Sequence, residues 1–403
     1  MAEIAPFAGL RFAEGVAGPL DRAICPPYDV ISEHGRDELL ARGDHNLVRV
    51  EGWRDAPPDP ARYRSAAEAL MAWRASGALR REPSPALYLY EQGFRLDGAE
   101  HRRRGFLCAL RLYEEGDGMV LPHERTFPRA RADRLELLRA SRANTSPIFG
   151  LVEDRARAIA RAFEETAGRD PDAQAVIAGE LHRLWVASDA ALIGAVVDAL
   201  RPERVYIADG HHRYETALTY LRDLRAAGRA RALDAPEAFV LAFLCALDDP
   251  GLRILATHRV VRGADAALEA AASRSFERGP IDAGALRDQQ PGIALARGGA
   301  FERLTPRPEV DLSALPETWR TLPVAQAEEL LVRPAREAGA EVEYEHDLGR
   351  AIDAARDGAV AVLLRAVDPE TLRRVADAGE RLPQKTTYFH PKVPAGLVVR
   401  ALD

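Results

Sequence analysis

The chain has 403 residues and a formal net charge of −7. This length favours two or three domains over one small core, and the acidic balance disfavours a large nucleic-acid-binding surface. No apolar run reaches the roughly 18 residues that a membrane span requires, and the N-terminal residues lack the pattern of a secretory signal. We therefore expect a cytoplasmic protein with neither a membrane nor a nucleic acid as its partner; the oligomeric state is left open.

Cysteine usage agrees with a reducing compartment. Cys25, Cys108 and Cys245 are scattered, and each lies in an apolar stretch. An odd, scattered set is a poor disulfide framework and a poor zinc site. We expect buried free thiols and no structural zinc.

Lysine is nearly absent. Of 55 Lys and Arg residues, only Lys385 and Lys392 are lysines. Where arginine has replaced lysine almost everywhere, a surviving lysine can mark a position that requires a compact ammonium. Because lysine is a frequent phosphate partner, the pair suggests a phosphate-binding segment. The alternative is that two residues are too few to carry a signal.

The first predicted elements are a loop-rich start, a helix and a hairpin. Paired prolines favour an extended path over Cys25–Ile31 and exclude a helix there. Apolar spacing predicts an amphipathic helix over 60–76. Residues 86–95 and 103–113 are strand-like and flank Asp97-Gly98, a hairpin signal.

The central part of the chain alternates helices and strands. Helices are predicted over 133–143 and 154–167, followed by a strand over 182–187 and a helix that Asp189 caps. Further on, a strand over 205–208, a helix over 214–227 and a buried strand over 238–247 form a βαβ-like unit.

The remainder continues in the same manner. Three helices (264–273, 346–356, 368–379) and two strands (292–304, 358–364) are predicted. The chain thus belongs to the mixed α/β (α+β) class with several domains. We place these at 1–114, an α+β region with the hairpin; 115–263, a central ligand-binding region; and 264–403, an α/β region with the lysine-bearing loop 383–392.

The segment Asp209–Arg213 gathers four titratable residues at a predicted strand-to-helix turn. Gly210 permits the sharp turn and the close approach of a ligand. The helix start offers unpaired N–H groups and a positive dipole end, which attract phosphate. His211, His212 and Arg213 add donors at the same point. The alternative is a capping Asp209 with satisfied polar neighbours, but such groups are costly to bury without a partner.

Other polar stretches could converge on this turn. In 122–126, His123 and Glu124 could contact a ligand or act as an acid–base pair, the alternative being a solvated loop. The triplet 257–259 could reach the same ligand or be a satisfied strand end, and 144–147 is interpreted as a turn. The flexible polar segment 384–392 suits a loop that closes over phosphate. A Walker loop, an H-E-x-x-H motif and a G-x-S-x-G elbow are all missing from the sequence.

Several stretches, in order, resemble the bacterial and archaeal family known as domain of unknown function 1015 along nearly the whole chain. They are Pro6–Gly9, Pro26–Ile31, Asn46–Arg49, Leu121–Glu124, Asn144–Phe149, Ile207–Ala217, Thr257–Arg259 and Pro383–Lys392. Membership of that family implies no particular activity.

The Asp209–Arg213 run also resembles the ligand loop of the ParB/sulfiredoxin superfamily, in which a Gly-x-His-Arg-type turn at a helix start holds nucleotide phosphates. Free-serine kinases of that superfamily carry a near-identical run. The resemblance implies that Gly210, His212 and Arg213 hold phosphate and that Asp209 lies near the transferred group. The chain lacks the cysteine that sulfiredoxins carry at this loop, which argues against sulfur chemistry.

Our first hypothesis is a small-molecule kinase that transfers phosphate from ATP or ADP, with Mg²⁺, to a hydroxyl, with L-serine as the leading candidate. Phosphoryl transfer needs mainly positioning and charge neutralisation. The expected catalytic residues are Asp209, His211, His123 and Glu124; those expected to hold phosphate or nucleotide are Gly210, His212, Arg213, His258, Arg259, Lys385, Thr386 and Thr387. The rival hypotheses are a nucleotide-binding or DNA-associated switch of ParB type, which the net charge disfavours, and a phosphatase or other phosphate-ester hydrolase.

Overall fold

A computed structural model describes residues 1–124, 128–166, 168–229, 232, 234–282, 284, 286 and 292–403. The chain divides into two compact units. The first holds Met1–Pro122, most residues from there to Leu252, and Pro391–Asp403; the second holds Arg253–His390 with residues 123–124. Compact units need not be domains that fold alone, so the domain boundaries near Glu114 and Gly263 stay predictions.

The first unit is built on one large sheet, which has nine strands in the part of the chain described. Eight follow one another in the order β6 (Val120–Pro122), β11 (Val205–Asp209), β8 (Ile148–Val152), β12 (Phe239–Ala246), β5 (Ala99–Arg111), β4 (Leu87–Leu96), β10 (Glu180–Ala187) and β9 (Ala173–Ile177), and β1 (Ile4–Ala5) pairs with β5. All residues of β12 are buried, as its continuous apolar sequence predicted.

The hairpin predicted around Asp97-Gly98 is confirmed. Strands β4 and β5 pair antiparallel out to Leu96 and Ala99. Asp97 and Gly98 both have positive φ angles, 52° and 80°. This is the turn whose twist matches that of paired strands.

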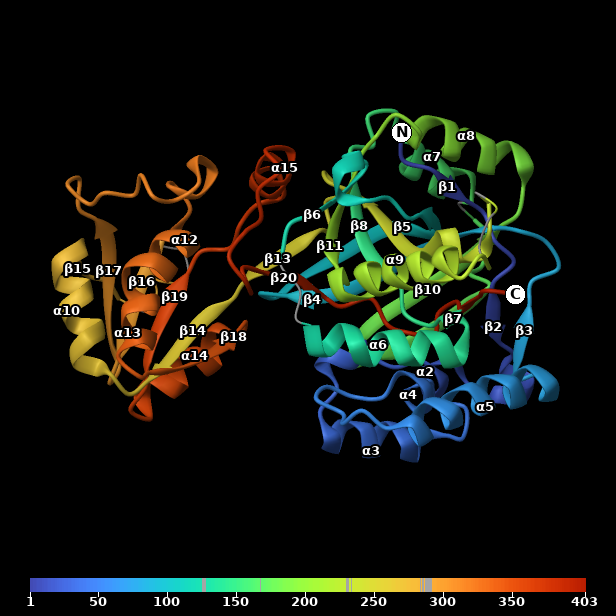
Figure 1. Ribbon diagram of the computed structural model, residues 1–403, viewed down its shortest axis with the longest axis horizontal. Coiled ribbons are helices and arrows are strands. Elements are labelled where there is room, and N and C mark those ends of the chain that lie inside the picture. The colour runs from blue at the N-terminus through green and yellow to red at the C-terminus, as the bar shows by residue number, and fades with distance from the viewer. Residues whose placement is uncertain are drawn as a thin grey trace. The chain divides into compact units, whose positions relative to one another are not determined.

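Helices cover the sheet in layers (Figure 1). Helix α9 (His211–Ala226) packs on β8 and β12, α6 (Pro128–Ser141) packs on α9, and α5 (Pro60–Ser76) packs on α6. Helix α5 has the predicted bounds and buries Tyr63, Leu70 and Trp73. Elsewhere α7 (Ala158–Glu165) packs against α8 (Ala190–Leu200), whose first turn is capped by Asp189 as predicted.

Short helices and strands make up the rest of the N-terminal region. They are β2 (Leu10–Phe12), α1 (Glu14–Ala17), α2 (Leu20–Ala23), α3 (Glu33–Arg42), α4 (Val48–Glu51) and β3 (Leu79–Arg81). Residues 399–401 connect to two other parts of the first unit: Val399 bridges to Leu10 in the N-terminal region, and β21 (Arg400–Ala401) pairs with β7 (Ala143–Asn144).

Three local predictions were wrong, in addition to that for the segment 384–392. The prolines of 25–31 do hold an extended path, but Tyr28–Val30 then closes a 3₁₀ turn, because Pro27 constrains only itself and its predecessor. Strands β11 and β12 run antiparallel to each other, since β8 between them pairs antiparallel with one and parallel with the other, so they do not form a parallel βαβ unit. The strand predicted over 292–304 is a hairpin, β16 (Ile293–Arg297) and β17 (Ala300–Pro306), which turns at Gly298-Gly299.

The second unit contains a six-stranded sheet within its described residues. The order is β15 (Phe276–Pro280), β17, β16, β19 (Val360–Leu364), β14 (His258–Arg262) and β18 (Glu341–Glu345). Alternating residues face opposite sides: Val360 and Val362 belong to one apolar cluster, and Ala361 and Leu363 belong to another.

Helices cover both faces of this sheet. One face carries α10 (Asp265–Ser275), α12 (Pro323–Ala327), a π-helical turn (Glu328–Val332) and α13 (Arg333–Glu337), and the other carries α14 (Leu348–Arg356). Helix α15 (Pro369–Asp377) follows β19.

The segment expected to be a flexible loop is partly a strand. Within 384–392, β20 (Thr387–His390) pairs antiparallel with β13 (Arg253–Ala256). The prediction of a wholly flexible segment was wrong, because the alternation of Thr387, Tyr388 and Phe389 suits a strand that has a partner elsewhere in the chain.

The mixed α and β fold class is confirmed, and the three cysteines are buried and free as expected. Among the described helices, none is both long and apolar enough to cross a membrane.

Candidate functional site

The chain turns sharply where β11 ends and α9 begins. Gly210 adopts the left-handed conformation, with a φ of 87°, and its carbonyl accepts the first helical hydrogen bond from the Tyr214 N–H at 3.0 Å. A Cβ at this position would lie 3.0–3.1 Å from the guanidinium of Arg213. Glycine is therefore required twice, for the backbone angle and for the close approach of Arg213.

Asp209 holds two cations at this turn. Its Oδ1 accepts from Lys392 Nζ at 2.7 Å, and its Oδ2 accepts from Arg213 Nη2 at 2.8 Å. All three side chains are mostly buried, with 13–20% exposure. Burial alone would raise the pKa of the Asp209 carboxyl, but Lys392 and Arg213 outweigh burial and hold that pKa well below its usual range. Asp209 is thus a permanent anion at neutral pH.

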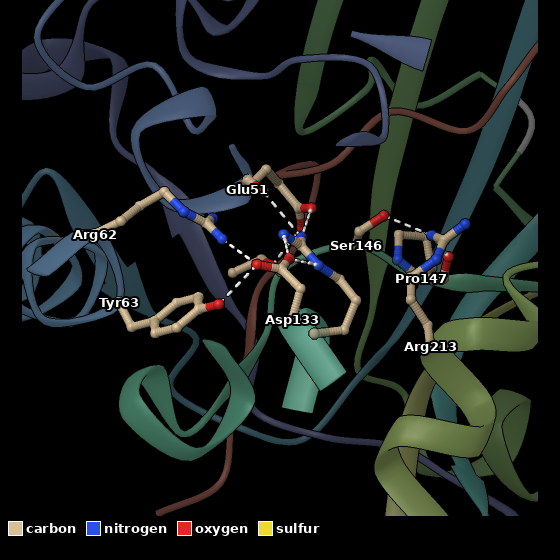
Figure 2. Close-up of polar contacts among 9 residues, drawn as sticks. Glu51, Arg62, Tyr63, Asp133, Ser146, Pro147 and Arg213 are labelled. Atoms are coloured by element: carbon tan, nitrogen blue, oxygen red, sulfur yellow. Dashed lines mark hydrogen bonds and ion pairs between the residues drawn. The ribbon is translucent and has the colours of Figure 1, made fainter. Parts of the chain in front are cut away.

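Arg213 also reaches away from the turn. Its Nη1 donates to Ser146 Oγ at 2.5 Å and to the carbonyl of Pro147 (Figure 2). Arg213 therefore ties the start of α9 to the connection between β7 and β8. The planar guanidinium makes this possible, because its forked donors can serve two directions at once.

The start of α9 is equipped to bind an anion. Helix α9 has 16 residues, and the start of such a helix carries a positive dipole end. Lys392 and Arg213 add two positive charges beside Asp209. His211, the first helical residue, is buried, and His212 is half-buried. Phosphate or carboxylate is the group that such a helix start accepts.

Two buried polar side chains, Arg103 and Gln92, hydrogen-bond to the backbone carbonyls of Pro391 and Lys392. Arg103, which is fully buried, donates from Nη2 to the Pro391 carbonyl at 2.7 Å and to the side-chain oxygen of Gln92. Gln92 Nε2 donates to the Lys392 carbonyl at 3.1 Å and to Glu180 Oε2 at 2.9 Å. The bonds from Arg103 and Gln92 fix the backbone at Lys392 and direct its side chain to Asp209. Burial raises the pKa of Glu180, the other partner of Gln92, to about 7.

Most of the remaining predicted site residues belong to the second unit, where the structure brings them together. His123 Nε2 lies 3.0 Å from Thr387 Oγ1, and the His123 carbonyl accepts from the Leu382 N–H at 2.8 Å. Glu124 Oε1 accepts from the backbone N–H of Lys385 at 2.8 Å, while the Lys385 side chain is exposed.

Thr386, His258 and Arg259 are engaged mainly with backbone groups. Thr386 Oγ1 donates to the Pro383 carbonyl at 2.5 Å, and His258 Nδ1 accepts from the Leu364 N–H at 3.1 Å. Burial, helped by the charge of Arg259, lowers the pKa of His258 to about 4.

Arg259 is fully buried in the second unit. It donates to the carbonyls of Thr257 and Gln384 (3.2 Å to the latter) and to Glu328 Oε2 at 3.4 Å. Its guanidinium also lies 5.2 Å from the centre of the Tyr344 ring. Arg259 thus joins three segments of the second unit.

Two residues at the turn were missing from the predicted set. Lys392 had a sequence signal, because it is one of only two lysines, yet Lys385 was chosen in its place. Ser146 had no signal of its own, since its stretch was interpreted as a simple turn. Arg125 and Thr126, part of a polar stretch named in the sequence analysis, lie outside the described residues.

The described residues contain no group of three or more His, Cys, Asp and Glu side chains that could hold a metal ion by themselves. A Mg²⁺ that travels with a nucleotide needs only one or two protein carboxylates, because phosphates and water supply its other ligands. Asp209 is a carboxylate at the turn that meets this smaller requirement.

The sequence pattern of the family described as "Protein of unknown function (DUF1015)" matches residues 4–325. A search of curated proteins found no match. Among solved structures, SbnI with C-terminal truncation from Staphylococcus aureus is 14% identical, covers 73% of this chain and 87% of its own, and has a TM-score of 0.41. A free serine kinase in complex with AMP is 15% identical, covers 69% and 89%, and has a TM-score of 0.35. A conserved hypothetical protein from Pyrococcus furiosus is 15% identical, covers 70% and 92%, and also has a TM-score of 0.35. Likeness this remote says nothing about activity.

Proposed function

This chain belongs to the DUF1015 family, and we propose that it is a small-molecule kinase that moves the terminal phosphate of ATP or ADP to a hydroxyl, with free L-serine as the first acceptor to test. The observation that carries the proposal is the Lys392–Asp209–Arg213 group at the left-handed glycine before α9.

The turn supplies what a phosphate needs. The N–H groups of the first helical turn, Gly210 and the side chains of His212 and Arg213 would hold the phosphate oxygens. Lys392 adds a compact ammonium, and a loose phosphoryl-transfer transition state is stabilised mainly by such positioned charge. The resemblance of Asp209–Arg213 to the nucleotide loop of the ParB/sulfiredoxin superfamily points to the same ligand.

Asp209 suits orientation better than proton removal. Its low pKa makes it a weak base, so it would fix Lys392 and Arg213 and orient the acceptor hydroxyl. As the hydroxyl oxygen bonds to the terminal phosphorus, the bond from phosphorus to the nucleotide's bridging oxygen breaks, and the nucleotide leaves with that oxygen. The hydroxyl proton passes to the transferred phosphate.

Mg²⁺ would neutralise charge on the nucleotide phosphates, with Asp209 as its protein ligand. His211 would act beside Asp209, and its proximity contributes to the low pKa of that carboxyl.

The residues of the second unit form the second part of the proposal. Within that unit, His123 and Glu124, together with Lys385, Thr386 and Thr387, would form a ligand-contacting group of their own, supported by His258 and Arg259. Their mutual contacts within that unit support a common role.

The test is ligand-induced thermal stabilisation with ATP, ADP, AMP and pyrophosphate plus Mg²⁺, each with and without L-serine, followed by a phosphate-transfer assay. A ligand at a hundred times its Kd stabilises the folded state by roughly 2.7 kcal/mol, which is readily measured. We expect a shift with ATP or ADP that serine increases, and phosphoserine as product. Phosphate release without any acceptor would indicate a hydrolase instead, and the lack of any nucleotide shift would refute the phosphate turn.

A further inference from the structure

A small pocket adjoins the turn in the first unit. It lies between α6, α9 and the connection from β7 to β8, and its volume is about 50 Å³. A buried water needs roughly 10–15 Å³, so the pocket has room for several waters or a short organic molecule. Arg213 lines this pocket and also contacts Asp209, which makes the pocket a neighbour of the proposed phosphate site.

A buried hydroxyl in the pocket lacks a partner. Thr216, on the first turns of α9, lines the pocket and is only 3% exposed, and its Oγ1 makes no hydrogen bond with any described residue. Threonine in a helix can bond back to the preceding turn, as Thr219 does with the Glu215 carbonyl at 2.8 Å. A buried polar atom without a partner costs free energy, so a ligand or water that bonds to Thr216 is favoured.

Charged side chains form one wall. Glu51 is buried; it accepts from Thr145 Oγ1 at 2.5 Å, and its carbonyl accepts from Arg134 Nη1 at 2.9 Å. Behind Arg134, Asp133 Oδ1 accepts from Tyr63 at 2.8 Å and is also paired with Arg62, and Figure 2 shows these side chains pointing at that carboxylate.

Two arginines face this pocket. Arg134 and Arg213 both line it, and their guanidinium groups would attract the carboxylate of a ligand in this poorly solvated place. Leu137, Leu138 and Val240 also line the pocket and provide an apolar surface for a short carbon chain.

We propose that this pocket is the acceptor site and that it binds a short hydroxy-carboxylate, with Thr216 as a specificity-determining residue that hydrogen-bonds to it. The carboxylate pairs with the arginines that line the pocket, the short chain fits the volume and the apolar side chains, and the hydroxyl is the phosphate acceptor. This inference rests on the function proposed above, because it names the substrate class of that reaction.

The experiment measures the affinity of the intact chain for four probes by calorimetry, with ATP and Mg²⁺ titrated separately. L-serine and D-glycerate carry both a hydroxyl and a carboxylate; propionate lacks the hydroxyl and ethanolamine lacks the carboxylate. We expect the first two to bind and the last two to bind at least tenfold more weakly.

The decisive variant is Thr216→Val, which keeps the shape of the side chain and removes the unpartnered hydroxyl. The folded state should be as stable as the wild type or more so, whereas the affinity for L-serine or D-glycerate should fall about five- to tenfold, as expected for one lost hydrogen bond. Thr216→Ser should restore binding. Thr219→Val, on the same helix but outside the pocket lining, is the matched control and should leave every affinity unchanged.

The outcomes separate the two proposals. If ATP binds but the hydroxy-carboxylates do not, or if Thr216→Val leaves their affinity unchanged, the pocket holds water only and this inference is overturned while the phosphate site stands. If the hydroxy-carboxylates bind in a Thr216-dependent way but no nucleotide binds, the pocket stands and the kinase proposal falls.

Discussion

The two units each contain a buried arginine on which several segments converge, but the two arginines have different partners. Arg213 shares a carboxylate with Lys392 at a helix start, beside a pocket. Arg259 donates mainly to backbone carbonyls and lies under the ring of Tyr344. The first arrangement gathers two cations around one carboxylate at a helix start, and the second uses its donors to hold loops in place. Buried arginine by itself is therefore no sign of a binding site; the kind of partner decides.

The sharpest test of this comparison is Asp209→Asn. The amide would leave Lys392 and Arg213 without their shared anion and would no longer orient the acceptor, so we expect kcat to fall by roughly 10²–10⁴. The measurement is phosphate transfer from ATP to L-serine, with a melting curve for each protein. Asp223→Asn, in an exposed ion pair on the same helix, should keep full activity. An active Asp209→Asn variant would reject the role given to this carboxylate.

Arg259→Met should act on stability. It would leave the carbonyls of Thr257 and Gln384 and the side chain of Glu328 without their donor, so we expect the second unit to lose about 3–5 kcal/mol of stability. Hydrogen exchange of β14 and β19 measures this directly. Arg262→Met, exposed on the same strand, is the control. If the Arg259 variant kept its stability but lost nucleotide affinity, the two arginines would have the same role and the comparison would fail.

Acid should weaken the second unit through His258. Its pKa is about 4 in the folded state, below the ordinary value of 6.5, so the unfolded chain binds the proton first as pH falls. The neutral imidazole is fully compatible with folding above pH 6.5, and we expect a loss of about 2 kcal/mol by pH 5. His258→Asn keeps an acceptor for the Leu364 N–H and should remove this part of the pH dependence in denaturant titrations. An unchanged slope would mean that His258 takes up its proton equally in the folded and unfolded states and contributes nothing to the acid sensitivity.

The two lysines give the smallest effect and the most direct comparison. Lys392→Met should weaken ATP binding about tenfold, since it removes a buried ammonium beside the phosphate site. Lys385→Met should weaken it only about two- to fivefold, because the side chain of Lys385 is exposed. Calorimetry on both variants tests the order. A larger loss from Lys385 would place the principal phosphate lysine in the second unit.

Local signals predicted much of the fold. Helix α5 and the hairpin at Asp97-Gly98 came from periodicity and turn chemistry, which act over a few residues. The relative direction of β11 and β12 could not be predicted, because β8, which lies between them in the sheet, precedes both in the chain. The apolar periodicity also predicted one strand where the structure has β16 and β17. The two adjacent glycines between them interrupt the alternation of side chains but do not by themselves show that the chain reverses direction.

The candidate site divides in the same way. Gly210 and its neighbours could be recognised because the turn and its charged groups are contiguous in sequence. Lys392 and Ser146 could not be assigned to the site, because each is placed there by a contact with a distant part of the chain. Thr216 could not be assigned because its signal is a buried hydroxyl without a partner, which only the structure shows. Scarcity of lysine identified the right pair of residues but not which of the two meets Asp209.

The path of the chain has a consequence for biosynthesis. Asp209 and Lys392 are separated by 183 positions, and the second unit occupies most of the interval. During translation the strand that carries Asp209 emerges long before Lys392, which pairs with the Asp209 carboxylate. Closing so long a loop slows the formation of this ion pair. The nascent first unit must therefore wait for residues 391–403, and a chain that stops before Lys392 cannot assemble the charged turn.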